Sequence, residues 1–516
     1  MDQDKSGSMN HRQKSSPSST TNTLKSGFED GKLGRLLSFF KDRDWNRLRL
    51  FLDSPYFNRS PALRTLFEYY WETIVKAQPA QEDEAVYQRV YPGQMFDPIK
   101  LKNIRAAFQR KVDDFMAQSA YEADEPLQAR MRLRKLNMLT ENEYFPRYCL
   151  RAKEMPQECF LDEENRRLHL YYLSAEDEIA KSRHQDRTRL LEGSIAAYQY
   201  AWEFFQLQTM RHIIGMLNAK NITGREVDLR IAEAILKLIP IDQESLPAIM
   251  LYRQSLEMHM RPDEPGILES FLAKLHHYAD KMLISDARYL FRSALNFCLL
   301  RGNKGEEGTN YASLEIYKEM DKRDLFLVEG CIPATLFKEL VTQGILCKDF
   351  EWTDRVIQKY ESLVAGDPDK TTANFNRGFL HYCKQEYVEA QRCLHRVLDH
   401  YDDVFFGFDA RILLLRIYYE TQSFQAMDSF IDSFKMYVKR NKRVGKSKIE
   451  LGLNAAKLFR KLVHVKPWDL TALEKLEAEV SSTPVNPSSK SWFLDQTMLL
   501  LSKARSLPNS RVKHRR

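Results

Sequence analysis

The stretch Asn374–Asp403, NFNRGFLHYCKQEYVEAQRCLHRVLDHYDD, decides the fold more than any other part of the chain. It predicts two short antiparallel helices joined by a tight turn. Gly378 would permit close approach of the paired helix, and Ala390 would let the second helix pack tightly against the first. An apolar face on such a hairpin can be buried only against neighbouring hairpins, so the stretch indicates a stack of helices.

The spacing of Gly378, Tyr387, Ala390 and Leu394 resembles that of a tetratricopeptide repeat. Like Tyr387 and Ala390, three other pairs consist of an aromatic residue and the residue three positions after it. The aromatic residues of successive pairs are 37 to 39 positions apart. The other three instances are Tyr311 with Leu314, Phe350 with Thr353, and Phe424 with Met427. The usual period is about 34 residues, so these are lengthened, degenerate units. The resemblance implies a helical-repeat protein that holds other molecules.

Composition agrees with a helical protein. The chain has 516 residues, of which 43% are hydrophobic and 29% are charged, and only 19 each are glycine and proline. Long periodic runs between so few turn residues favour helices over short strands. Seven cysteines without a CxxC pair predict reduced thiols in a cytoplasmic protein. Neither a signal peptide nor a membrane-spanning segment is expected.

The N-terminal region shows a second, separate helical pattern. Ser60 and Pro61 have the residue types of a helix N-cap and first turn, and Asp97-Pro98 repeats that signal. The succession of a helix, the turn DSPYFN, an aromatic helix and the segment VYPGQMFDPIKLKN resembles a group of bacterial all-helical proteins without an assigned activity. That resemblance implies an α-helical repeat protein and no particular reaction.

Positive charge is concentrated at the C-terminus. Residues 435–516 hold 19 Lys and Arg against 6 Asp and Glu, which leaves 59 against 65 for residues 1–434. Such an end suggests an acidic partner, nucleic acid or protein, or simply a solvated face. The candidate basic patch consists of Lys439, Arg440, Lys442, Arg443, Lys446 and Lys448.

Motifs for known chemistry are not found. No GxxxxGK[ST] loop, HExxH pair or GxSxG elbow occurs in the sequence. Gly445-Lys446-Ser447 mimics the end of a phosphate-binding loop, but Arg440 stands where its first glycine is required. We therefore predict no catalytic, metal or cofactor site and expect that the protein is not an enzyme.

The candidate peptide groove follows from aligning the repeats on Gly378. Some tetratricopeptide domains grip a peptide's C-terminal carboxylate with Lys and Asn residues, and this alignment puts Lys338 and Asn376 at such places. Asp409 and Leu413 stand where the family has basic residues, which weakens that interpretation. Phe375, Phe379 and Tyr382 fall on the same predicted inner face, where core packing is the alternative explanation.

The sequence thus predicts an all-α, right-handed α-solenoid of tetratricopeptide-like hairpins preceded by a helical module. The expected segments are a disordered tail (1–27), the N-terminal module (28–160), the repeats (161–434), a basic helical cap (435–505) and a basic tail (506–516). The leading hypothesis is a non-catalytic cytoplasmic scaffold that binds a protein or peptide on its concave face. The alternatives are a nucleic-acid-associated protein and an enzyme without a recognisable motif.

Overall fold

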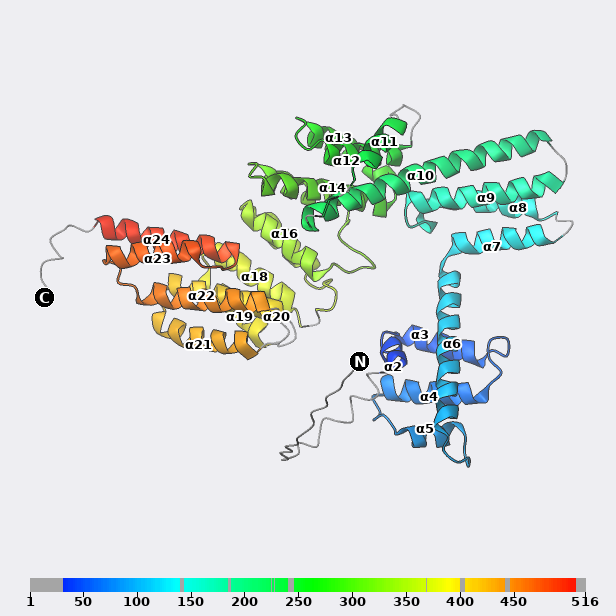
Figure 1. Ribbon diagram of the computed structural model, residues 1–516, viewed down its shortest axis with the longest axis horizontal. Coiled ribbons are helices and arrows are strands. Elements are labelled where there is room, and N and C mark those ends of the chain that lie inside the picture. The colour runs from blue at the N-terminus through cyan, green and yellow to red at the C-terminus, as the bar shows by residue number, and fades with distance from the viewer. Residues whose placement is uncertain are drawn as a thin grey trace, which may run out of the picture. The chain divides into compact units, whose positions relative to one another are not determined.

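The computed structural model describes residues 31–139, 143–183, 187–223, 225–226, 228–239, 246–367, 369–399, 404–440 and 446–506. These residues form 23 α-helices, labelled α2 to α24, and two short 3-10 helices (Figure 1). The β-structure among them is limited to isolated bridges. The predicted all-α class is therefore confirmed. The predicted tail 1–27 lies outside the described residues, and of the predicted tail 506–516 only Ser506, the last residue of α24, is described.

The described residues divide into two compact units. Unit 1 takes those within Met1–Phe160 and Arg166–Ala201, and unit 2 takes those within Leu161–Asn165 and Trp202–Arg516. Unit 1 extends beyond residue 160, where the N-terminal module was expected to end, because it also includes Arg166–Ala201. The segment 435–505, expected as a separate cap, belongs to the same unit as the hairpins before it.

Unit 1 is built around aromatic side chains. Its helices are α2 (Lys32–Leu37), α3 (Asp42–Asp53), α4 (Pro61–Ile74), α5 (Asp83–Val90), α6 (Pro98–Ala123), α7 (Glu125–Met138) and α8 (Phe145–Lys153). The 3-10 helix η1 (Gln157–Cys159) follows them. Two further helices, α9 (Glu163–Arg183) and α10 (Arg187–Thr223), have residues in both units.

The longest helix of the N-terminal module shows how sequence positions the core. The side chain of Asp97 accepts hydrogen bonds from the backbone N–H groups of Ile99 and Lys100, and Pro98 occupies the first turn, as predicted. The ring of Phe108 stacks on Tyr70 with their centroids 5.4 Å apart. At the other predicted start, Ser60 occupies the N-cap position of α4 but its side chain makes no capping hydrogen bond.

Unit 2 continues as packed helix pairs to the C-terminal end of the described chain (Figure 1). The first of its helices are α11 (Arg230–Leu238), α12 (Pro247–Met260), α13 (Ile267–Tyr278), η2 (Ala279–Lys281), α14 (Ile284–Asn303), α15 (Thr309–Lys322), α16 (Ala334–Leu346) and α17 (Phe350–Tyr360). They are followed by α18 (Thr371–Cys383), α19 (Tyr387–Asp399), α20 (Val404–Glu420), α21 (Phe424–Arg440), α22 (Lys446–His464), α23 (Leu470–Ser482) and α24 (Pro487–Ser506). Each helix from α14 to α23 packs on the next one along the chain, and in addition α16 packs on α18 and α18 on α20.

One turn geometry recurs between the helices of three successive pairs. The backbone N–H of Asp349 bonds to the carbonyl of Gly344, that of Glu386 to His381, and that of Ser423 to Tyr418, at distances of 2.8 to 2.9 Å. The residues before these donors, Lys348, Gln385 and Gln422, all have positive φ angles between 58° and 63°. This is the helix-ending Schellman geometry, repeated at a spacing of 37 residues.

The hairpin quoted first, α18 with α19, has the close contact that its sequence predicted. A Cβ added to Gly378 would lie 2.8 Å from Cγ of Leu394, so only glycine fits there without displacement. Ala390 is fully buried. The first helix begins three residues before Asn374, at Thr371, and the second ends at Asp399. Residues 400–403 lie outside the described part of the chain.

Two simpler expectations can be compared with the structure. In the part of the chain that the structure describes, no helix is long and apolar enough to cross a bilayer. All seven cysteines are free thiols, although Cys331 is exposed rather than buried.

Candidate functional site

Helix α16 separates two cavities in unit 2. Thr335, Leu336, Glu339 and Gln343 line one cavity, and Lys338 and Thr342 line the other. Residues three or four positions apart share a helix face, so these two sets occupy different faces of the same helix. A single helix therefore lines two separate cavities.

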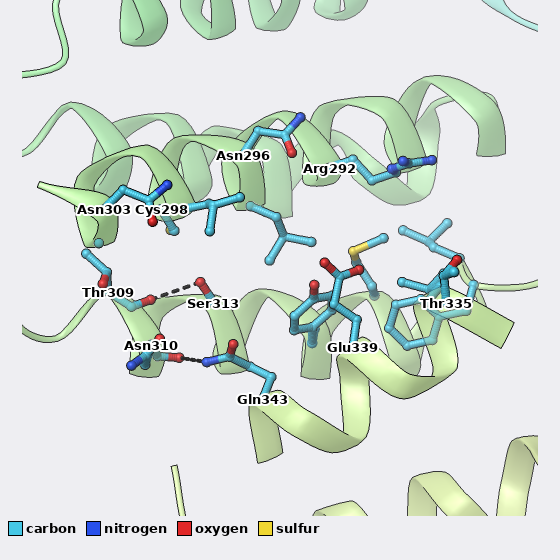
Figure 2. A pocket seen from close by; sticks show the side chains of 18 of the residues that line it. Arg292, Asn296, Cys298, Asn303, Thr309, Asn310, Ser313, Thr335, Glu339 and Gln343 are labelled. Carbon is cyan, nitrogen blue, oxygen red and sulfur yellow. Dashed lines mark hydrogen bonds between the residues drawn. The ribbon is translucent and has the colours of Figure 1, made fainter. Parts of the chain in front are cut away.

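The larger cavity has a volume of 610 Å³ and lies between α14, α15 and α16. We call it the amide cavity because four carboxamide side chains line it: Asn296, Asn303, Asn310 and Gln343. Figure 2 shows these residues around the opening, with Asn296 on one side and Gln343 on the other. Its size is within the range of small-ligand and peptide pockets.

Most of the amide groups remain available for a ligand. Gln343 donates from Nε2 to the backbone carbonyl of Asn310 at 2.8 Å (Figure 2). The side chains of Asn296 and Asn303, in contrast, make no hydrogen bond to any residue that the structure describes. Each carboxamide has donors and an acceptor, and a peptide backbone presents the complementary groups. The cavity is therefore suited to binding main chain irrespective of sequence.

Charges at the amide cavity are mixed, with a small negative excess. Glu306, Glu307 and Glu339 line it together with Arg288 and Arg292. Arg288 is engaged, because its guanidinium donates to the backbone carbonyls of Leu325 and Leu327 at 2.7 Å. Burial raises the pKa of the Glu339 carboxyl above its usual value, and Arg292 partly offsets this.

The smaller cavity has a volume of 250 Å³ and lies among α16, α18, α20, α22 and the start of α24. We call it the aromatic cavity because Phe375, Phe379 and Phe408 form much of its wall. Its other apolar lining residues are Ile412, Leu413, Leu451 and Ala455. The helices α16, α18 and α20 are the first members of three successive pairs, so much of the cavity follows one face of these pairs.

Lys338 places a cation over the aromatic wall. Its ammonium lies 4.9 Å from the ring centroid of Phe375 and 5.3 Å from that of Phe406. The same nitrogen is 2.7 Å from Oδ2 of Asp409, which also lines the cavity. Both side chains stay about one-third exposed, at 37% and 29%. An ion pair of this exposure is weak, so a ligand can compete for either partner.

Arg416 is the second cation of the aromatic cavity, and it is 91% buried. Its Nη2 donates to Oγ of Ser489 at 3.2 Å, whereas its buried Nε has no partner. Among the described residues, no carboxylate forms an ion pair with this guanidinium. Burial lowers the pKa of Arg416 below its usual value, which reflects the cost of a desolvated charge.

Glu420, one helical turn beyond Arg416, is already satisfied. Its two carboxylate oxygens accept from the hydroxyls of Tyr382 and Tyr387 at 2.5 and 2.9 Å and from Nε1 of Trp492 at 2.7 Å. Burial, helped by Glu420, raises the pKa of Tyr387 to about 12. This network fixes α24 against α20 and so holds one wall of the aromatic cavity in place.

The five predicted groove residues divide into three groups. Lys338, Phe375 and Phe379 line the aromatic cavity together. Tyr382 contributes to the network of Glu420 and is not among the lining residues. Asn376 is fully buried, away from the lining, and neither its amide nitrogen nor its amide oxygen has a hydrogen-bond partner. The Lys–Asn pair expected for a carboxylate clamp does not meet in one cavity.

The predicted basic patch is only partly described. Lys439 and Arg440 end α21 and are exposed. Lys448 is half-buried, with its ammonium 5.2 Å from the ring centroid of Phe408, beside the aromatic cavity. Lys442 and Arg443 lie outside the described residues, as does the side chain of Lys446.

Sequence reasoning missed the amide cavity and the role of Arg416. Asn296 and Gln343 lie on helices whose pairing geometry was needed to bring them together. Asp409 had been noticed only as a departure from a basic consensus. A signal for Arg416 was present, because an arginine within the apolar run Ile412–Ile417 must either be buried or break the pattern.

Two buried polar clusters contain residue types that occur in catalytic centres. Nε2 of His259 is 2.9 Å from Oγ of Ser293, which is 2.7 Å from Oγ of Ser255. Burial lowers the pKa of His259 to about 4. This resembles a base and a nucleophile, but both serines are at least 98% buried and Nδ1 of His259 has no orienting partner. The cluster therefore stabilises the packing of α12 on α14.

The second cluster caps the start of α9. Asp286 accepts from the hydroxyl of Tyr252 and from the backbone N–H of Glu163, both at 2.8 Å. Burial raises the pKa of Asp286 to about 6. Asp162 and Arg211 form an ion pair beside it. All these groups are occupied with one another at a helix N-terminus, which is a structural arrangement.

Comparisons with known proteins give no further assignment. No family model matches the chain, and no curated protein or solved structure was found to be similar to it. Among the residues that the structure describes, no group of His, Cys, Asp or Glu is placed to hold a metal ion.

Proposed function

We propose that the protein is a non-catalytic scaffold that binds a peptide segment of another protein along one face of unit 2. In this proposal the helix pairs form a right-handed α-solenoid, and α14, α16, α18, α20 and α22 line its concave side. The bound segment crosses α16 and occupies the amide cavity and the aromatic cavity together.

The observation that carries the proposal is the pair of cavities on two faces of α16. The first helices α14 and α16 line the amide cavity together with the second helix α15, the first helices α16, α18 and α20 line much of the aromatic cavity, and both cavities retain polar groups that a ligand can engage. The recurring turn supports a regular stack, because identical helix ends at a constant spacing position successive pairs alike. Rigid helices can present such a surface with little loss of conformational entropy on binding.

The two cavities would contribute different parts of the affinity. The carboxamides of the amide cavity would bind peptide main chain, and the aromatic cavity would take an apolar side chain. Full burial of a side chain such as Leu or Phe contributes about 1.5–3 kcal/mol. Together with main-chain hydrogen bonds this is typical of helical surfaces that bind short segments.

Selection from a random-peptide library on the full-length chain tests the proposal. Binders should emerge, and their affinity should fall when Leu299, which is 62% exposed in the amide cavity, is changed to Ser. The matched control is Val388→Ser, because Val388 is 72% exposed on α19 and lines neither cavity. A library that yields no binder, or binders that depend on Val388 and not on Leu299, would contradict the proposal. Tight binding of an oligonucleotide instead would favour the nucleic-acid alternative.

A further inference from the structure

The aromatic cavity is lined by charged side chains as well as by apolar ones. Its charged lining residues are Lys338, Arg416 and Asp409, so the cavity carries a net charge of +1. The ammonium of Lys448 lies on the ring of Phe408 at its edge and adds to the positive potential. An aromatic wall with excess cations is complementary to a ligand that is both apolar and anionic.

Arg416 places positive charge at one defined position in the aromatic cavity. Its side chain is 91% buried and its Nε lacks a hydrogen-bond partner, while Nη2 donates to Oγ of Ser489 and Glu420 interacts with the guanidinium electrostatically. Burial disfavours the charged guanidinium, and the electrostatic attraction of Glu420, one helical turn away, offsets only part of that cost. A carboxylate is the usual partner that satisfies such a group, often through two parallel hydrogen bonds.

The start of α24 gives an independent contribution at the same place. Asn486, Ser488 and Ser489 line the cavity, and they are the cap and first turn of a 20-residue helix. The positive end of the helix dipole therefore points toward the region in which Arg416 lies. Oδ1 of Asn486 already accepts from the backbone N–H and the hydroxyl of Ser488, so an anion would be attracted mainly by the helix dipole and by Arg416.

We propose that the aromatic cavity recognises an acidic side chain, Asp or Glu, that adjoins an apolar residue within the bound peptide. The carboxylate interacts with Arg416 and Lys338, and the apolar neighbour packs on Phe375 and Phe379. This inference rests on the proposed peptide-binding function and adds the class of peptide that is bound. A C-terminal carboxylate is not required, because Asn376 is buried outside the cavity.

Asp409 provides a further test, because its carboxylate would compete with the acidic side chain of the ligand for Lys338. Its carboxylate already pairs with Lys338 at 2.7 Å, so an incoming acid must share or displace that contact. The isosteric change Asp409→Asn removes the competitor and raises the cavity charge to +2. Affinity for an acidic peptide should then rise, whereas a ligand that used Asp409 as its partner would bind more weakly.

The experiment begins with peptides selected on the full-length protein. Their sequences should be enriched in Asp or Glu next to an aromatic or aliphatic residue. Fluorescence anisotropy then compares each peptide with its Glu→Gln or Asp→Asn form and with a C-terminally amidated form. We expect the acid-to-amide change to weaken binding about tenfold, which is about 1.4 kcal/mol, and amidation to have no effect.

Variants of the protein complete the test. Lys338→Met should weaken binding of the acidic peptide about threefold to tenfold, and Asp409→Asn should strengthen it by a similar factor. The matched controls are Lys359→Met and Asp324→Asn, a half-exposed pair 2.8 Å apart that lines neither cavity. Arg416→Lys is added with a thermal-denaturation measurement, because a buried position can affect folding.

The outcomes separate the two proposals. Selected peptides without acidic enrichment, or with affinities unchanged by Lys338→Met and Asp409→Asn, would overturn the inference and leave the peptide-binding function intact. Loss of binding on amidation would replace the side-chain carboxylate with a chain terminus and would also overturn it. If no peptide is selected, both the function and the inference fail.

Discussion

The two cavities beside α16 differ in volume, in charge and in the side chains that line them. The amide cavity is the larger, has a slight negative excess and offers side chains that match any peptide main chain. The aromatic cavity is less than half that volume, has a positive excess and is walled by three phenylalanines. Affinity without sequence preference and preference for one kind of side chain can therefore arise on adjacent faces of one helix. Under the proposed peptide-binding function, the two cavities would therefore contribute affinity and specificity separately.

His259, which lies outside both cavities, should make the stability of the folded protein depend on pH. Burial lowers its pKa to about 4, against 6.5 in the unfolded chain, so the folded protein holds the neutral imidazole. Stability due to this group is complete above about pH 6.5, falls as the pH drops, and is fully lost below about pH 4. The total loss is about 3 kcal/mol. The stability difference between wild type and His259→Gln should change by this amount between pH 7 and pH 4.

Urea denaturation at several pH values measures that difference. Asp286 contributes with the opposite sign, since burial raises its pKa to about 6 and its contribution is lost as the pH rises from about 4 through 6. Taking the difference between wild type and His259→Gln removes this contribution. His277→Gln is the control, because His277 is exposed. A pH-independent difference for His259→Gln would show that the imidazole is not held neutral by burial.

Adjacent residues of α16 allow each cavity to be blocked separately. Thr342→Trp would fill part of the aromatic cavity, and Gln343→Trp would fill part of the amide cavity. We expect each to weaken a selected peptide by at least about tenfold, because each excludes one part of the ligand. The preference for an acidic over an amide side chain should disappear only in Thr342→Trp.

Titration of the acidic peptide and its amide form against both variants measures that preference. The two substitutions introduce the same side chain one position apart, so each is the control for the other. Equal loss of the acidic preference in both variants would mean that the cavities act as one site, and the comparison between them would be wrong.

Ionic strength distinguishes the cavities by a smaller effect. Raising the salt from about 0.1 M to about 1 M shortens the screening length from about 10 Å to about 3 Å. Lys338 is partly exposed, so the acid-dependent part of the affinity should fall about threefold, while main-chain binding in the amide cavity should change little. Isothermal titration calorimetry in both buffers provides the measurement. A fall of about a thousandfold would instead indicate contacts with nucleic-acid phosphates.

The sequence predicted local structure well and the site only in part. The Asp97 cap, the close approach at Gly378 and the aromatic residues that begin α17, α19 and α21 follow from local rules, and the structure confirms them. Lys338 and Phe375 were found because the repeat register places them on one face. Asn376 was assigned to that face as well. It follows Phe375 directly on α18, and successive residues of a helix point in different directions, so its side chain is buried in the core.

What the sequence could not show depends on contacts between distant segments. Arg416 on α20 and Ser489 at the start of α24 are 73 positions apart, and their hydrogen bond joins helices of different pairs. The amide cavity depends on how far apart α14 and α16 are held, which no periodicity in either helix encodes. Such distances follow from packing of the intervening α15 and not from the pattern of any one segment.

The smallest expected effect concerns the negative charge of the amide cavity. The residue Glu339 as a whole is exposed at the rim. Its carboxyl points into the cavity (Figure 2), where partial burial raises its pKa. The charged form is therefore disfavoured in the folded state, and its cost is present near neutral pH and absent below about pH 4. Glu339→Gln should raise the free energy of unfolding by about 0.5 kcal/mol at pH 7 and leave it unchanged in acid. Thermal denaturation at both pH values, with Glu307→Gln on the same rim as the control, measures this, and an equal gain at both pH values would assign the effect to packing and not to charge.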